Sequence, residues 1–388
     1  MLSLCILNIV SFKGLVRFNF LLFSFKFFVI ILTITWLMRT HFDTQNFSAL
    51  TSSLNPSNWK AILAAVASGG VAFAFTGFKH GVELAGESQK SSRTVPIAII
   101  GSVICCLLLY LGLQIAFIGA LEPTLINSGW QHLSFSGDVG PFVGIAGLLG
   151  LGLLVKLLYM DAIISPLGAG FVYITSTSRI IYAMSKQGYL PALFSKLNQE
   201  HFPIYAIAFN FAVGLFLFLP LPGWQAMVSF LVSAVVISYA MGPIALLCLR
   251  LQLPSEKRPF RLPAANIICI FAFYCCNLIS YWTGWDTISK LSIAMSIGLL
   301  LLGFAYARNS INRMKLGLKG LLWLAPYLSG LASISYFGSF GGKGLIPFGW
   351  DFLVIALFSL VIMKLALISR ASNIQEQFSS FKLLEATY

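Results

Sequence analysis

Long apolar stretches separated by short polar connections run along almost the whole chain. A helix rises 1.5 Å per residue, so roughly 20 apolar residues cross a hydrocarbon core of about 30 Å. By this measure the sequence predicts spans at residues 18–38, 59–87, 95–120, 142–185, 203–220, 225–249, 264–284, 287–306, 320–340 and 349–369. The long stretch 142–185 predicts one kinked helix or a helix with a cytoplasmic extension. No stretch shows the alternation of a transmembrane barrel, so the pattern predicts an all-α integral membrane protein.

The second span differs from an ordinary lipid-facing helix because glycines and a polar pair interrupt it. The glycines of the segment 57–87 are Gly69, Gly70, Gly77, Gly81 and Gly86. Lys79 and His80 lie in its second half. Backbone that leaves the helical path inside a membrane must be surrounded by protein or water, and transporters bind substrate at such breaks. The segment is therefore the first candidate for a binding site.

Composition and charge agree with a membrane protein. Hydrophobic residues make up 58% of the 388 residues and charged residues 10%, and the mean hydropathy is +0.87. A soluble domain is about 25% charged. The net charge of +13 could suggest a nucleic-acid partner, so the positions of the basic residues matter.

Basic residues gather in every second connection. One set of connections holds Lys13, Arg17, Lys90, Arg93, Arg179, Lys186, Lys196, Arg250, Lys257, Arg258, Arg261, Arg308, Arg313, Lys315, Lys319, Arg370 and Lys382. The other set holds only Arg39, Lys60, Lys290 and Lys343. By the positive-inside rule the first set and the C-terminus are cytoplasmic. The basic excess is thus a topology signal for the cell membrane, and no nucleic-acid partner is expected.

The first apolar stretch, residues 1–11, is too short to span a bilayer and has no basic region ahead of it, so it is not a signal peptide. With Lys13 and Arg17 on the cytoplasmic side, it reads as the inner end of a helix whose upper part is absent. We therefore expect a chain that lacks its beginning.

Residues that could support enzyme chemistry show no organised pattern. All seven cysteines lie in apolar stretches without C-x-x-C spacing, as expected of small packing residues. The sequence has no nucleophile elbow, Walker loop or zinc motif. We predict no enzyme activity, no cofactor and no metal.

A lysine at the bilayer centre costs about 2.5–3.5 kcal/mol, so each one needs an explanation. Lys26 lies deep in the span 18–38; it either extends its stem to the cytoplasmic surface or is a buried amine that takes and releases a proton during transport. Lys79 either lines a cavity, facing an anionic substrate group or a carboxylate, or lies with His80 in a solvated vestibule.

Other polar groups in the spans leave alternatives open. Lys156 and Asp161 are five residues apart, a poor spacing for a pair on one helix, so we expect partners on other helices or a lysine facing a crevice. Glu83 is expected to be solvated or to pair with Lys90 or Arg93. Ser165 and the proline after it indicate a second helix irregularity, either a simple kink or freed carbonyls that line a second part of the site.

Three segments resemble the amino acid–polyamine–organocation (APC) permeases. FAFTGFKHGVELAGESQKSSRTVPIAIIGS is similar to that family's sixth helix and following loop. DAIISPLGAGFVYITSTSRIIYAMSKQGYLPALFSKLN is similar to its eighth helix with the signature behind it. PLPGWQAMVSFLVSAVVISYAMGPIALLCLR, with RPFRLP, resembles the tenth helix and its cytoplasmic exit.

The resemblance implies a five-plus-five inverted-repeat transporter fold, incomplete at the N-terminus and with extra C-terminal helices. On that plan, residues 1–58 are the end of the fourth helix and the fifth helix, and residues 59–249 are the complete second repeat. Residues 250–370 are four additional helices, and residues 371–388 are a cytoplasmic tail.

The resemblance also implies roles for individual residues. Phe73 falls at a gating aromatic, and the unwound stretch that contacts substrate is Ala74, Phe75, Thr76 and Gly77. Lys26 matches a lysine that replaces a sodium ion in some proton-coupled members, and Ser165 lies near the part of the eighth helix facing the same site. Lys79 stands where many relatives carry glutamate, which could suit an acidic substrate.

We therefore predict a proton-coupled amino-acid symporter of the cytoplasmic membrane that works by alternating access. Its partners are an amino acid, protons and the lipid bilayer. The alternative is a permease remnant or membrane assembly partner that does not transport. Uptake experiments distinguish these hypotheses.

Overall fold

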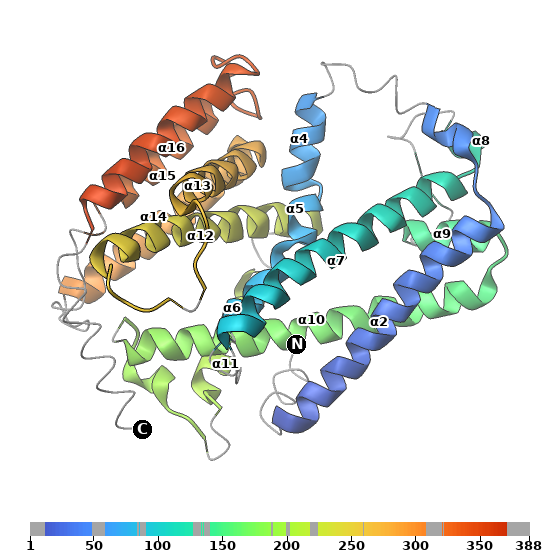
Figure 1. Ribbon diagram of the computed structural model, residues 1–388, viewed down its shortest axis with the longest axis horizontal. Helices are drawn as coiled ribbons and strands as arrows, with labels where there is room; N and C mark the ends of the chain where they lie inside the picture. The colour runs from blue at the N-terminus through green and yellow to red at the C-terminus, as the bar shows by residue number, and fades with distance from the viewer. Residues whose placement is uncertain are drawn as a thin grey trace. The chain divides into compact units, whose positions relative to one another are not determined.

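The computed structural model describes residues 12–48, 59–83, 85, 91–126, 133, 135, 140–187, 189–198, 202–217, 224–258, 260–307, 320 and 322–370 (Figure 1). All regular structure in these ranges is helical. The predicted all-α class is confirmed for this part of the chain.

The helices follow the predicted stretches closely. The N-terminal half contains α2 (Phe12–Thr40), η1 (Thr44–Phe47), α4 (Trp59–Ser68), α5 (Val71–Ala74), η3 (Thr76–Lys79), α6 (His80–Glu83), α7 (Ser91–Ala120), α8 (Pro123–Ile126), α9 (Pro141–Leu148) and α10 (Gly152–Lys186). The C-terminal half contains η6 (Ala192–Ser195), α11 (Ile204–Leu217), α12 (Trp224–Gln252), α13 (Ala265–Trp282), α14 (Trp285–Ala307), α15 (Leu324–Phe337) and α16 (Trp350–Ile368).

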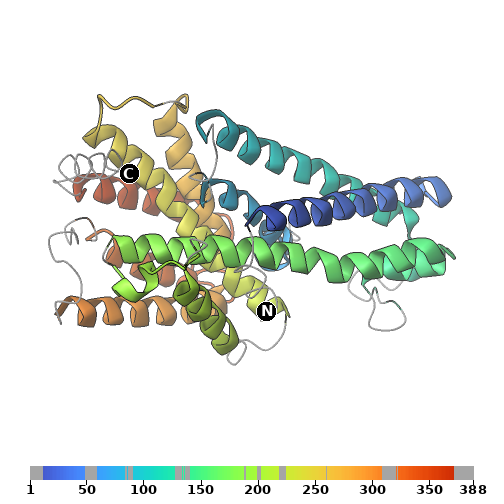
Figure 2. The same cartoon turned by 90° about the horizontal axis from the view of Figure 1, so that it is seen from below.

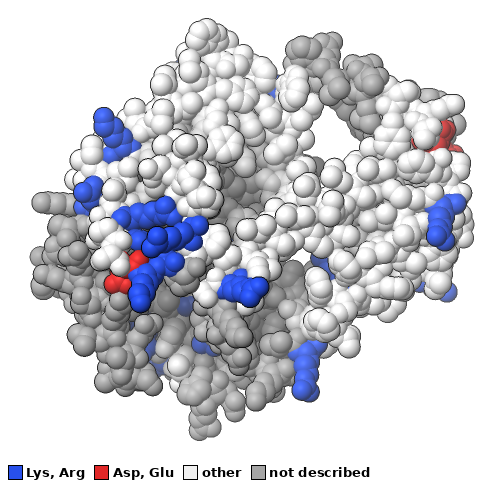
Figure 3. Space-filling view, in the orientation of Figure 1, with Lys and Arg blue, Asp and Glu red and all other residues white. Residues whose placement is uncertain are grey.

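Six helices are long and apolar enough to cross a membrane within the described ranges, namely α2, α7, α10, α12, α13 and α16. The bent segment from Trp59 to Glu83 makes a seventh if it is counted as one span. On α7, the side chains of Ile100, Ile104 and Leu108 are each more than half exposed, as a lipid-facing helix requires. Figure 3 shows that the visible face is mostly uncharged, with Lys and Arg in a few places.

The stretch 142–185 contains a break that was not predicted. Helix α10 continues through Pro166, so the kink expected near Ser165 does not end the helix and stays a prediction. The interruption lies earlier, between α9 and α10, where Gly150 has φ of +69°. Only glycine adopts that conformation at low cost, so the chain turns there.

The described residues fall into two compact units. The first draws on Met1–Pro56 and Phe78–Leu217. In it α2 lies alongside α7 and α10, as Figures 1 and 2 both show. Leu37 of α2 packs with Ala116 of α7 and Ile145 of α9 in a buried apolar cluster.

The second unit draws on Ser57–Gly77 and Phe218–Tyr388. Helices α12 and α13 pack together at its core, and α14, α15 and α16 pack around them. Buried Asn277 is satisfied by two neighbours: its amide donates to Ser359 Oγ at 2.9 Å and its carbonyl accepts from Tyr327 at 3.0 Å. The predicted boundaries at residues 58, 249 and 370 separate repeats along the chain, whereas the two compact units are defined by contacts in space. The compact units therefore do not test these boundaries, which stay a prediction.

Candidate functional site

The predicted break in the second span lies at Gly69 and Gly70. Helix α4 ends at Ser68, and the axis bends by 41° before continuing from Val71 to Glu83. Gly70 has φ of +95°, and a Cβ on Gly69 would lie 2.6 Å from the Ala65 carbonyl oxygen. Both positions therefore require glycine.

The backbone after the break is short α-helix followed by a 3₁₀ turn. α5 ends at Ala74, and η3 begins at Thr76. The Thr76 hydroxyl donates to the Phe73 carbonyl at 2.8 Å, and the Tyr239 hydroxyl of α12 donates to the Thr76 carbonyl at 2.6 Å. These bonds anchor the broken segment to α12 within the second unit.

The five predicted lining residues differ in exposure. Ala74 and Gly77 are exposed, Phe73 and Phe75 are half-buried, and Thr76 is buried. Phe73 packs against the valines of α12, a cluster that includes Val232. All five belong to the second unit, whereas Lys79 belongs to the first.

Lys79 belongs to a charged cluster centred on Glu83. The Glu83 carboxylate lies 3.5 Å from Lys79 Nζ and 2.8 Å from His80 Nδ1, and it accepts a hydrogen bond from Ser176 of α10. Tyr173, also of α10, makes an edge contact with His80 and lies 6.0 Å from the Lys79 ammonium. The cluster connects α6 to α10.

This cluster corrects the prediction for Glu83, which is neither solvated nor paired with Arg93. Lys90, its other predicted partner, and Glu87 lie outside the described residues. Spacings of three and four residues from His80 and Lys79 could have indicated the pairing on a helix. No sequence signal pointed to Ser176.

Lys26 and Ser165 come together at a second place in the first unit. A cavity of about 200 Å³ lies between α2 and α10. Its lining includes Asn19, Phe23, Lys26, Ser165, Gly168 and Val172. A Cβ on Gly168 would meet Asn19 Oδ1 at 3.3 Å, so the glycine lets the two helices approach closely.

Asp161, one helical turn before Ser165, adds a carboxylate to this region. The Lys26 ammonium is close enough to act electrostatically on Asp161. Asp161 Oδ1 is buried, and no described residue donates a hydrogen bond to it. Lys26 on α2 is thus a cation within electrostatic range of Asp161 from another helix, without a direct ion pair among the described residues, while Lys156 is exposed.

Metal binding has no support in this part of the chain. Among the described residues, no three His, Cys, Asp or Glu side chains lie close enough together to hold an ion.

Comparison with known proteins gives the family. The profile described as amino acid permease matches residues 1–302. The chain belongs to the amino acid permease family. The permease is 38% identical over 353 residues to the glutamate/serine transporter AimA of Bacillus subtilis, covering 90% of the chain and 65% of that relative. It is 36% identical over 361 residues to the aspartate-proton symporter of the same organism, covering 92% of the chain and 69% of that relative.

A more distant relative is the branched-chain amino acid permease BcaP of B. subtilis, 23% identical over 319 residues, with 76% of the chain and 66% of that relative covered. The permease therefore spans about two thirds of the length of these relatives. It is a multi-pass membrane protein of a transporter family, and it is not an enzyme.

Proposed function

We propose that the permease transports amino acids across the cytoplasmic membrane together with protons, by alternating access in a five-plus-five inverted-repeat fold. Family membership supports the substrate class. One relative is named for glutamate and serine and the other for aspartate and protons, which favours acidic and small polar amino acids.

The observation that carries proton coupling is the shared cavity of Lys26 and Ser165, which are far apart in sequence. An amine in an apolar span is costly when charged and unpaired. An ionised Asp161 would reduce this cost when Lys26 is protonated. Loss of the proton would leave the carboxylate without its cation.

This relation suggests how a proton could drive the conformational cycle. With Lys26 protonated, attraction to Asp161 would hold α2 against α10. With Lys26 neutral, that attraction would vanish and the helices could separate. A ligand or proton shifts such an equilibrium only by the difference in its affinity for the two states. Lys26 would carry the proton. Asp161 would make Lys26 bind the proton more tightly in the state in which α2 and α10 are close together than in the state in which they are apart.

Substrate would bind beside the segment from Phe73 to Gly77, directly after the helix break. Transporters bind substrate at such breaks in a spanning helix. Lys79 is the candidate for a second carboxylate, and it would have to exchange Glu83 for the substrate. Ser165 is a candidate lining residue near the proton carrier. The C-terminus would be cytoplasmic, as the basic connections indicate.

Uptake into proteoliposomes tests the proposal. Labelled glutamate, aspartate and serine are offered to vesicles with an imposed inward proton gradient, with protein-free vesicles as the control. We expect gradient-dependent uptake of at least one of the three, abolished by a protonophore. Uptake no greater than in protein-free vesicles would refute transport and favour the alternative of a non-transporting permease or assembly partner.

A further inference from the structure

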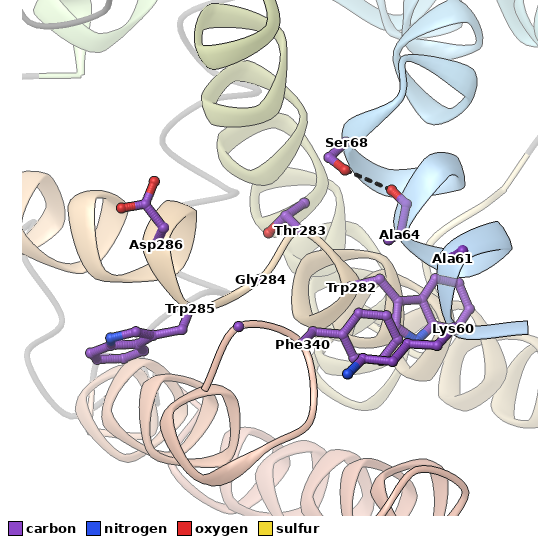
Figure 4. A pocket seen from close by; sticks show the side chains of 11 residues that line it. Lys60, Ala61, Ala64, Ser68, Trp282, Thr283, Gly284, Trp285, Asp286 and Phe340 are labelled. Carbon is purple, nitrogen blue, oxygen red and sulfur yellow. Dashed lines mark hydrogen bonds between the residues drawn. The ribbon is translucent and has the colours of Figure 1, made fainter. Parts of the chain in front are cut away.

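A cavity of the second unit lies directly before the break, with Ser68 in its lining, and has no part in the proposed transport mechanism. It has a volume of about 550 Å³, within the range of small-molecule sites. Figure 4 shows residues from α4, from the α13–α14 corner and from the loop after α15 around it. The residues that matter for the argument are Lys60, Ser68, Trp282, Thr283, Asp286 and Phe340.

The walls around this cavity are held in place. The Trp285 backbone N–H donates to the Phe340 carbonyl at 3.0 Å. The Ser339 backbone N–H donates to the Tyr281 hydroxyl at 3.0 Å, and Tyr281 is fully buried. The rings of Tyr281 and Phe340 pack edge to face with centres 5.2 Å apart. The loop is thus fixed against the end of α13 before any ligand arrives.

Most polar side chains around the cavity already have partners. The Ser68 hydroxyl donates to the Ala64 carbonyl at 2.7 Å (Figure 4). The Thr283 hydroxyl donates to the Ser280 carbonyl and accepts from Ser233. Asp286 accepts from Lys290 at 2.7 Å.

One lining group keeps spare hydrogen-bonding capacity, and it is a donor. The Lys60 ammonium lies 5.7 Å from the centre of the Phe340 ring, and no carboxylate of the described residues pairs with it. Trp282 also lines the cavity, but its Nε1 is buried, so the indole contributes its apolar surface. An ammonium can only donate, so Lys60 needs an acceptor.

The charge around the cavity favours an anion. Lys290 offsets Asp286, which leaves Lys60 as the uncompensated charge of the lining residues. Helix α14 also begins at the cavity edge, and a helix N-terminus favours negative charge. The rings of Trp282 and Phe340 supply an apolar wall.

We propose that this cavity binds a small organic carboxylate that carries an apolar group. The carboxylate would accept from Lys60, and the apolar group would lie against the aromatic wall of Trp282 and Phe340. Bound ligand would connect α4 to the α13–α14 corner and so restrain the first half of the broken span. Lys60, Lys290 and Lys343 belong to the non-cytoplasmic connections by the positive-inside rule, so the ligand would arrive from outside.

Phenylacetate is a suitable probe because it has a carboxylate and a ring but lacks the ammonium of an amino acid. Its binding to the full chain in phosphatidylcholine nanodiscs is measured by calorimetry, with phenylacetamide as the uncharged match. We expect saturable phenylacetate binding that is at least about tenfold tighter than phenylacetamide binding, because a charge-assisted hydrogen bond is lost in the amide.

Two variants and a matched control locate the site. Lys60→Gln removes the charge and should weaken phenylacetate binding at least about tenfold. Trp282→Ala removes part of the apolar wall and should weaken phenylacetate binding about threefold or more. Lys343→Gln removes a lysine that lies over Tyr336 and does not line the cavity, so it should leave affinity unchanged. Thermal unfolding confirms that each variant is folded.

Three results would overturn the assignment. One is equal affinity for phenylacetate and phenylacetamide. Another is full affinity in the folded Lys60→Gln variant. The third is Lys60-dependent retention of phosphatidylglycerol on purification with no phenylacetate binding, which would make the cavity a lipid headgroup site. Amino-acid uptake is a separate measurement, so failure here leaves the transport proposal standing.

Discussion

Glu83 and Asp161, two carboxylates of the described apolar helices, each lie near a cation. Glu83 contacts Lys79 and His80, and Asp161 is within electrostatic range of Lys26. A lone charge at the bilayer centre costs about 2.5–3.5 kcal/mol, and a partner reduces that cost. A proton or a charged substrate that changes either group would therefore change how tightly α6 or α2 is held to α10.

Replacing Lys26 tests the proton carrier at the residue scale. Lys26→Ala should abolish uptake driven by a proton gradient, because no titratable amine would remain in the cavity, while exchange without a gradient should persist. Lys156→Ala is the matched control, since Lys156 is an exposed lysine of α10. Gradient-driven uptake retained by Lys26→Ala would remove Lys26 from the mechanism.

Asp161→Asn tests the partner of that lysine. Without the carboxylate, the protonated amine loses an attraction of roughly 1 kcal/mol, so gradient-driven uptake should fall about fivefold. Asp161→Glu keeps the charge and should retain more activity than the asparagine variant. Equal uptake by both variants and the unmodified permease would show that Asp161 has only a packing role.

Glu83→Gln tests the role of Lys79. Removal of the carboxylate frees Lys79 from its neighbour at 3.5 Å, so glutamate should compete more strongly against serine for uptake. A few-fold change in the ratio of their half-saturation concentrations is expected, since a partly exposed pair contributes about 1 kcal/mol or less. An unchanged ratio would exclude Lys79 from substrate recognition.

At the scale of the elements, apolar length predicted where helices occur, and glycine predicted the break at Gly70. The turn at Gly150 was missed because glycine is common inside membrane helices and nothing polar marks this one. Pro166 lies inside α10, because spanning helices tolerate proline where neighbours satisfy the freed backbone groups. Partners far apart in sequence, such as Glu83 and Ser176, have no local signal.

The backbone at the break gives a prediction with an internal control. Gly70→Ala places a side chain at φ of +95° and should lower the free energy of unfolding by about 1–2 kcal/mol. Gly77→Ala should be nearly neutral, because a Cβ there meets nothing within 4 Å and its φ is not positive. Thermal unfolding in detergent compares them. Equal stability of the two variants would contradict the assignment of the break to Gly70.

At the scale of the whole molecule, sequence and comparison together give a multi-pass permease with a glycine break. The resemblance predicted both Lys26 and Ser165, and the structure places them around one cavity. The cluster around Glu83 and the cavity at Lys60 were not predicted, because each depends on helices that meet only in the folded chain. Such sites are visible only in the packing.

The central claim is that amino acids and protons cross together through a cycle that depends on Lys26. The most direct measurement is the internal pH of proteoliposomes, read from an enclosed dye, after glutamate, aspartate or serine is added outside. The account predicts that a transported amino acid acidifies vesicles containing the permease and does not acidify vesicles containing Lys26→Ala. Amino-acid entry without acidification, or acidification that persists in the Lys26→Ala variant, would contradict it.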